Sequence, residues 1–352
     1  MNKSKTPLPE NAVYTGRGTT ALWAILNALD RRGADVMLPV NICEIVIPVL
    51  LNAGLRPAFY DVDPNSGNTT IEILRASRTA RAAACIVVHN FGTPLEIGPM
   101  AEWAAREGLF LIEDACNALG AAWRGRPVGT FGDASIFSFG HAKIVAVGAG
   151  GALHVRDREM GEKAKQLLRS LPTASRVHKE ADVHFQSVLR SLRLNPIAQK
   201  PSIYRSLYGE YFPYLLFQPD EAMKKDMDQG LTGLEANLAS RRKKAALWRE
   251  CLTLATLEHR ELVEGDAVWR YTFLAPEKRR NGILEALSAA SIPASKWYPP
   301  VHTLFDEFSG FGAFPGAESF ASRCINVFVD ESVSVRRIRK AAELIQQTLE
   351  ES

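Results

Sequence analysis

A lysine that follows an apolar strand is the residue of this sequence best placed for covalent chemistry. Lys143 closes the segment 138–143 (SFGHAK), which begins at the end of an expected strand, 135–139. Partial burial beyond a strand desolvates an ammonium group, lowers its pKa and makes the amine a usable nucleophile for a Schiff base. Most lysines are solvated surface groups, so the assignment needs neighbours that complete a site.

Two further segments carry groups that an anionic, nitrogen-containing ligand would need. Residues 16–22 (GRGTTAL) open an expected helix, whose free N–H groups point at an anion that the glycines allow to come close. Glu113 and Asp114 follow the expected strand 109–112, and open α/β sheets bind ligands beyond the carboxyl ends of their strands. Each segment also has a plain structural explanation, a glycine turn and a helix cap.

Together the three segments match the division of labour in a site for pyridoxal 5'-phosphate (PLP). The helix start would hold a phosphate, a carboxylate would pair with a pyridine nitrogen, and Lys143 would form a Schiff base with an aldehyde. The sequence therefore predicts a PLP-dependent enzyme.

The elements that must position these groups alternate along the first part of the chain. Apolar segments typical of buried parallel strands recur between segments with helical spacing. The expected strands are 36–39, 57–62, 83–89, 109–112, 135–139 and 152–155. This order predicts an α/β fold, a mostly parallel central sheet flanked by helices.

The later part of the chain has a different pattern. Helices are expected at 159–169, 235–253, 278–290 and 333–349, with a strand at 268–274. This pattern predicts a smaller α+β C-terminal domain. We expect a large PLP-binding domain at 1–235 and a small domain at 236–352.

Composition narrows the class of protein. The 352 residues carry a net charge of only +3, which does not argue for nucleic acid binding. Five cysteines without a CxxC pair indicate thiols in a reducing compartment, so neither disulfides nor a metal site is expected. The first ten residues show no signal peptide, and no apolar run approaches the ~20 residues of a membrane span. We expect a cytoplasmic protein.

The sequence resembles the DegT/DnrJ/EryC1/StrS family, the sugar aminotransferases of PLP fold type I. Six motifs occur in the family's order through nearly the whole chain. They are residues 18–22 (SGTxAL phosphate loop), 53–63 (AGxxPxFxDVD), 88–94 (VHxxGxP), 112–115 (EDAAQ), 132–143 (GDAxxFSFxxxK) and 298–302 (YPxPxH). The resemblance implies the fold type I architecture and a homodimer with shared active sites.

The resemblance assigns cofactor roles by position. Lys143 would carry the Schiff base and later move the proton between cofactor and substrate. Asp114 would pair with the pyridine nitrogen. The phosphate contacts would come from Gly18, Thr19 and Ser138.

Other positions combine agreement and departure. Asn117 stands where the motif has glutamine, near the cofactor's phenolic oxygen, and Tyr298 and His302 would lie on the substrate side. Cys43 occupies the cofactor-binding place where the family stacks an aromatic ring. Further departures are Asn41, Leu119, Ile144 and the absence of the GxN segment that usually lends a phosphate contact from the partner subunit.

Residues 169–219 form a basic and aromatic segment with the character of an insertion. The segment holds seven Lys or Arg residues against three acids. It could contact an anionic group such as a nucleotide diphosphate, or residues 211–217 could form an interfacial membrane patch. The third reading is a solvated helix with an aromatic cluster at an oligomer interface.

Our main hypothesis is an aminotransferase that moves an amino group from an amino acid, L-glutamate by resemblance, to the keto group of a nucleotide-linked sugar. One alternative is a PLP-dependent sugar dehydratase, in which a histidine replaces the lysine; His141 keeps this reading open. A second alternative is a non-catalytic regulator or scaffold on a PLP fold, motivated by Cys43.

Overall fold

The centre of the protein is a seven-stranded sheet. The computed structural model describes residues 7–194, 201–308 and 310–350. The strand order is β1-β9-β8-β5-β4-β2-β3, and the pairs from β8 through β3 are all parallel. The strands are β1 (Val13–Thr15), β2 (Asp35–Pro39), β3 (Arg56–Tyr60), β4 (Ala82–Val88), β5 (Phe110–Asp114), β8 (Ala134–Ser138) and β9 (Gly151–Val155). The predicted mostly parallel sheet is confirmed, with β9 and β1 joining antiparallel at one edge.

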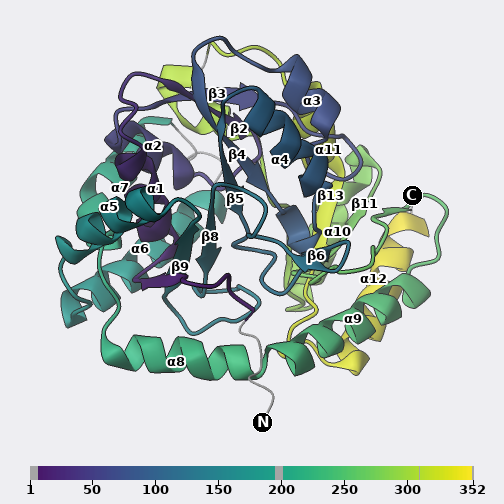
Figure 1. Cartoon of the computed structure of the whole chain (residues 1–352). Helices are drawn as coiled ribbons and strands as arrows, with labels where there is room; N and C mark the ends of the chain where they lie inside the picture. Colours follow the sequence, from purple (N-terminus) through teal and green to yellow (C-terminus); the bar gives the residue numbers. More distant parts are fainter. Residues whose placement is uncertain (1–6, 195–200, 309, 351–352) are drawn as a thin grey trace.

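Helices cover both faces of this sheet because successive strand residues point to opposite sides. Val36, Leu38 and Ile86 are buried against α1 (Gly18–Leu29) and α2 (Val46–Asn52), while Met37 and Cys85 face α3 (Ile71–Ala76) and α4 (Ile97–Arg106). Figure 1 shows the two helical layers on opposite sides of the strands. A fully buried aliphatic side chain contributes about 1.5–3 kcal/mol, so these two faces supply much of the core.

The C-terminal part forms its own small sheet and core. Strands β10 (Glu258–His259), β11 (Tyr271–Leu274), β13 (Cys324–Val327) and β12 (Ala294–Ser295) pair antiparallel in that order. Helices α9 (Leu234–Cys251), α10 (Glu277–Ala289) and α12 (Val335–Glu350) pack with β11 and β13 in one apolar cluster. The start of α9 coincides with the boundary we propose near residue 235.

The basic and aromatic segment folds as helices that pack on the large domain. It contains the end of α5 (Arg158–Arg169), then α6 (Arg176–Leu194), α7 (Pro201–Tyr211) and the 3-10 turn η3 (Phe212–Leu215). Leu215, Leu216 and Phe217 are buried, while Tyr214 is 43% exposed, so only the second half of the run 211–217 packs inward. Helix α8 (Glu221–Thr232) then leads to α9 along the lower edge in Figure 1.

Ion pairs account for several of the segment's cations. Arg176, Lys179 and Arg205 each lie within 3.3 Å of a carboxylate oxygen. Lys200, another of its basic residues, lies outside the described residues. None of the described helices is long and apolar enough to cross a membrane.

Some predictions of secondary structure from sequence periodicity were wrong. The expected strand 268–274 forms only from Tyr271, since Val268 has a left-handed φ of 49° and interrupts an extended strand. Among the elements that were not expected are β1, α3, α8, α11 (Pro315–Arg323) and β13. The elements β1 and α3 are short, and α8 has only two buried side chains, which gives a weak helical pattern.

Candidate active site

The predicted phosphate-binding residues come together at one edge of the large sheet. Asp114 ends β5 and Ser138 ends the adjacent parallel strand β8, so both lie at the carboxyl edge. Gly18 begins α1 beside them: a Cβ on Gly18 would lie 3.2 Å from Ser138 Cβ and 3.3 Å from Cys116 Sγ. The backbone at the helix start therefore lies directly against Ser138.

The start of α1 keeps its donors for a ligand. Arg17 occupies the N-cap position without a side-chain hydrogen bond to the helix, and the first turn contains no acid. Among the described residues, the Thr19 hydroxyl has no hydrogen-bond partner, while Ser138 Oγ accepts only a long bond of 3.4 Å from Gly140 N. Backbone N–H groups and two hydroxyls at a helix start form a site that fits a phosphate.

Lys143 is the first member of a hydrogen-bonded chain that crosses between the two parts of the molecule. Its Nζ donates to Asn117 Oδ1 at 2.7 Å, and Asn117 Nδ2 donates to the Tyr298 hydroxyl at 3.0 Å. Tyr298 is buried, and burial raises its pKa, so the phenol keeps a proton that it can offer to a ligand. The chain places an amine, an amide and a phenol side by side.

The charge environment of Lys143 differs from the one we expected. Burial acts to lower the pKa of Lys143, but Tyr298, Cys116, Cys43 and Asp114 together raise it above its ordinary value. The prediction of a lowered pKa is thus wrong for the protein chain alone, because ionisable neighbours outweigh desolvation. Before it could attack an aldehyde, the Lys143 amine would have to lose a proton against these neighbours.

Glu113 and Asp114 are adjacent in β5 but do different work. Glu113 is fully buried and accepts from three backbone N–H groups, those of Gly129, Phe131 and Gly132, and from His89 Nε2. Burial would raise the pKa of Glu113, but these hydrogen bonds lower it below its ordinary value.

Asp114 accepts one backbone hydrogen bond, from Cys116 N at 3.0 Å, and pairs with none of the described cations. Because Asp114 forms no ion pair within the described residues, its carboxylate could pair with a protonated ring nitrogen. The Glu113 carboxylate, in contrast, is occupied by hydrogen bonds within the protein.

An aromatic wall adjoins Tyr298, and the sequence did not reveal it. The Trp269 and Tyr298 rings are stacked with their centroids 6.2 Å apart and planes 13° apart, and Phe91 tilts against both. The Trp269 indole donates to Ala142 O at 2.5 Å, next to Lys143. Cys43 packs against the same apolar cluster as Tyr298. These contacts join residues far apart in the chain, so local sequence patterns could not predict them.

His302 is not brought into this group. Its ring packs with Phe314 and Phe59, at centroid distances of 4.9 and 6.4 Å, and burial lowers its pKa. No hydrogen bond or ring contact within the described parts joins it to Lys143, Asn117 or Tyr298. Its expected place on the substrate side stays a prediction.

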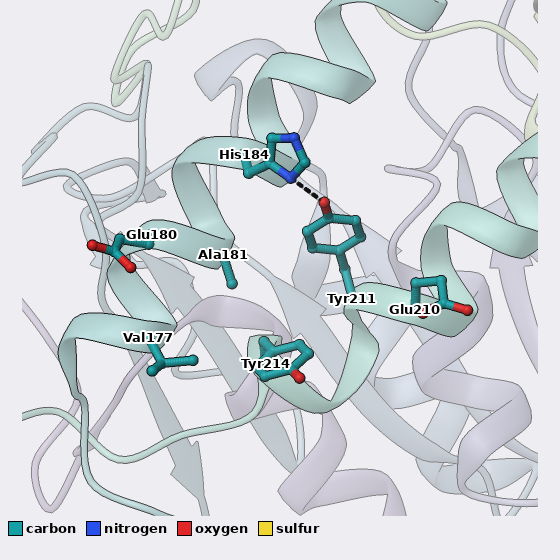
Figure 2. A pocket seen from close by; sticks show the side chains of 7 residues that line it. All are labelled: Val177, Glu180, Ala181, His184, Glu210, Tyr211 and Tyr214. Carbon is teal, nitrogen blue, oxygen red and sulfur yellow. Dashed lines mark hydrogen bonds between the residues drawn. The ribbon is translucent and has the colours of Figure 1, made fainter.

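A surface hollow of about 580 Å³ lies elsewhere, between α6, α7 and η3. Figure 2 shows His184 Nδ1 hydrogen-bonded to the Tyr211 hydroxyl at its rim, with the Tyr214 ring below. It contains none of the predicted cofactor or substrate residues, although all its lining residues belong to the basic and aromatic segment 169–219. Within the described residues, no group of His, Cys, Asp or Glu side chains is arranged to hold a metal ion.

The comparison with protein families matches this geometry. Residues 9–187 and 228–346 match the model of the DegT/DnrJ/EryC1/StrS aminotransferase family. The chain belongs to this family. Residues 188–227, which include α7, η3 and part of α8, fall outside the match. The same region lacks the GxN segment that the family resemblance led us to expect.

Curated relatives are named as sugar aminotransferases. The chain is 34% identical over 160 residues to a dTDP-4-dehydro-2,3,6-trideoxy-D-glucose 4-aminotransferase of Saccharopolyspora spinosa, covering 45% of this chain but only 42% of that relative. It is 28% identical over 345 residues to a UDP-N-acetyl-3-dehydro-alpha-D-glucosamine 3-aminotransferase of Acidithiobacillus ferrooxidans, covering 96% of this chain and 84% of the relative.

Solved structures support the fold. The aminotransferase TlmJ from Streptoalloteichus hindustanus superposes with a TM-score of 0.79 at 23% identity, covering 97% of this chain and 86% of that one. A DegT DnrJ EryC1 StrS aminotransferase from Brucella abortus gives 0.76 at 24% identity, covering 96% and 86%. The α/β architecture predicted from the sequence is confirmed.

Proposed function

We propose that this protein is a PLP-dependent aminotransferase that transfers an amino group from an amino acid, L-glutamate in the first instance, to the keto group of a nucleotide-linked sugar. The observation that carries the proposal is the chain Lys143–Asn117–Tyr298 beside Asp114 and the Gly18–Ser138 contact. Family membership and the names of the relatives support the same reaction.

The residues fit PLP in three separate places. Gly18, Thr19 and Ser138 would hold the phosphate, Asp114 would face the pyridine nitrogen, and Lys143 would bond to the aldehyde carbon. PLP supplies an electron sink that stabilises negative charge on the carbon next to the transferred nitrogen. Cys43 would contribute a thiol at the place where the family stacks an aromatic ring on the cofactor.

The protein's own groups can handle the proton. Lys143 is positioned by Asn117 and is the base nearest to the place of reaction, so it would take a proton from the donor carbon and return one to the acceptor carbon. Asn117 and Tyr298 would keep Lys143 oriented through both transfers. The contacting rings of Trp269 and Phe91 would shield one side of this group from water.

The alternatives are less well supported. The dehydratase reading required a histidine in the role of Lys143, but the His141 side chain is 59% exposed and its Nε2 lies 4.0 Å from Asp182 Oδ2 in α6. The scaffold reading relied on Cys43, yet the chain retains Lys143, Asp114 and Ser138, the residues that a PLP enzyme would need. We also propose that the protein is cytoplasmic and that it forms a homodimer with shared active sites.

A spectral titration tests the proposed function. Purified protein loaded with PLP should show a visible-edge band that L-glutamate converts to the band of the pyridoxamine form. Nucleotide ketosugars should then restore the first band and yield an amino sugar. A deoxy sugar as product, or no spectral response to any amino donor, would overturn the proposal.

A further inference from the structure

Arg270 is a buried cation that forms no ion pair within the described residues, and Asp330 is the one carboxylate there that acts on its pKa. The residue is 5% exposed and precedes β11. Among the described residues its guanidinium donates one long hydrogen bond, from Nη1 to Ser295 Oγ at 3.4 Å, and forms no ion pair. Charged side chains are rarely buried unless they are paired, because desolvation of an isolated charge is costly. An arginine has five N–H donors, so most of this recognition capacity is unused.

Arg241, which is also buried, donates to Asn237 Oδ1 and to Trp269 O. The Arg260 side chain lies 3.0 Å from Asp266, although its guanidinium nitrogens make no hydrogen bond within the described residues. Arg270 instead lies between two aromatic rings, 3.4 Å from the centroid of Phe328 and 4.4 Å from that of Trp269. Ring faces attract a cation but accept few of its hydrogen bonds. The rings thus hold the guanidinium flat and leave its edge for an acceptor.

Arg270 adjoins the Lys143 site through the aromatic wall. Trp269 stacks on Tyr298, which bonds to Asn117 and through it to Lys143. Burial lowers the pKa of Arg270 to about 10, and Tyr298 is the foremost of the groups that oppose this shift. Ser295, which holds the guanidinium, lies three residues before Tyr298. A small anion held at Arg270 would therefore lie on the Tyr298 side of the site.

We propose that Arg270 binds the carboxylate of the amino donor and so selects α-amino acids over plain amines. A planar guanidinium binds a planar carboxylate through two parallel hydrogen bonds, and the enclosure by Phe328 and Trp269 suits a small group better than a diphosphate. The inference rests on the proposed function, because it assumes that an amino donor reacts at Lys143. It adds a residue that the motifs of the sequence did not single out.

A purely structural role makes a different prediction. If Arg270 only fills space between two rings, its replacement would lower stability and affect both substrates alike. If it binds the donor carboxylate, its replacement would affect the amino acid and spare the ketosugar. Arg260→Lys is the control, since the Arg260 side chain is only 6% exposed but forms an ion pair with Asp266.

The experiment measures each half-reaction on PLP-loaded protein. Arg270→Lys and Arg270→Gln should raise the half-saturating concentration of L-glutamate about 10- to 100-fold, the loss expected for one charged hydrogen-bonding pair. The KM for the nucleotide ketosugar and the visible cofactor band should stay unchanged. Ethylguanidinium should partly restore the reaction of Arg270→Gln with L-glutamate, and Arg260→Lys should leave the glutamate response intact.

A second readout does not depend on turnover. Binding of 2-oxoglutarate, which carries the carboxylates but no amino group, should shift the cofactor spectrum of the wild type and shift it far less in Arg270→Gln. A wild type that converts glutamate normally beside variants with unchanged half-saturation would overturn the inference and leave the proposed function standing. A wild type that accepts no amino donor would overturn both.

Discussion

The two adjacent acids of β5 offer a sharp test of the account, because they should fail in different ways. Glu113→Ala removes the acceptor of four donors: Phe131 N at 2.7 Å, Gly132 N at 2.6 Å, Gly129 N at 2.8 Å and His89 Nε2 at 3.1 Å. Asp114→Asn removes a charge that, apart from Cys116, we expect only the cofactor to use. The first change should damage the fold, and the second should damage the chemistry.

The size of the Glu113 effect follows from its burial. Each buried donor left without an acceptor costs about 1–3 kcal/mol, and water entering the vacated space would recover part of that loss. Because four buried donors lose their acceptor and water would recover part of the loss, we expect about 4 kcal/mol, the lower end of the summed cost. At about 2 °C per kcal/mol for a chain of this size, Tm should fall by about 8 °C.

The assay compares both variants in thermal and urea unfolding and in cofactor absorbance. Asp114→Asn should unfold within about 1 kcal/mol of the wild type, because asparagine keeps the shape of the side chain and an oxygen that can accept from Cys116 N. It should nevertheless lose most of its half-reaction with L-glutamate, because the pyridine nitrogen would no longer be held protonated. A Glu113→Ala variant with wild-type stability, or an Asp114→Asn variant with normal turnover, would refute this division of roles.

Three further predictions follow from the same site. Gly18→Ala should weaken PLP binding by about 5- to 150-fold, since its Cβ would press on Ser138 at 3.2 Å and such overpacking costs about 1–3 kcal/mol; equilibrium titration with PLP measures this. PLP loading should accelerate as pH rises from 8 to 10, because the pKa of Lys143 is raised and only the neutral amine reacts; a flat stopped-flow profile would contradict it. The folded pKa of Glu113 is depressed, so its stabilisation is full above the unfolded value of about 4.3 and is lost as pH falls through the folded value; the stability gap between wild type and Glu113→Gln should close under acid.

Local sequence patterns predicted those candidate site residues that lie close together in the sequence or directly follow an apolar strand. Lys143 and Ser138 lie in one loop, and the strands before Asp114 and Ser138 are short apolar runs that could be recognised singly. Parallel pairing of β5 with β8 then brings their ends together, as expected for the carboxyl edge of an open sheet.

The features of the site that the sequence did not predict depend on contacts between residues far apart in the chain. Asn117 meets Tyr298 across 181 residues of chain. Arg270 is packed between Trp269, its neighbour in the chain, and Phe328, which follows β13. The raised pKa of Lys143 likewise depends on Cys43 and Tyr298, which reach it only in the folded chain. Motifs therefore predicted the cofactor residues, while only the tertiary structure shows the neighbours that shift the pKa of Lys143 and the aromatic wall beside Tyr298.

The most direct test of the central claim is to trap the cofactor on its lysine. PLP-loaded protein is reduced with borohydride, digested, and its peptides are sequenced by mass spectrometry, with Lys143→Ala as the control. The account predicts one pyridoxyl-modified residue, Lys143, and no modification or visible band in Lys143→Ala. Modification of another lysine in the wild type, or an unchanged yellow Lys143→Ala protein, would contradict it.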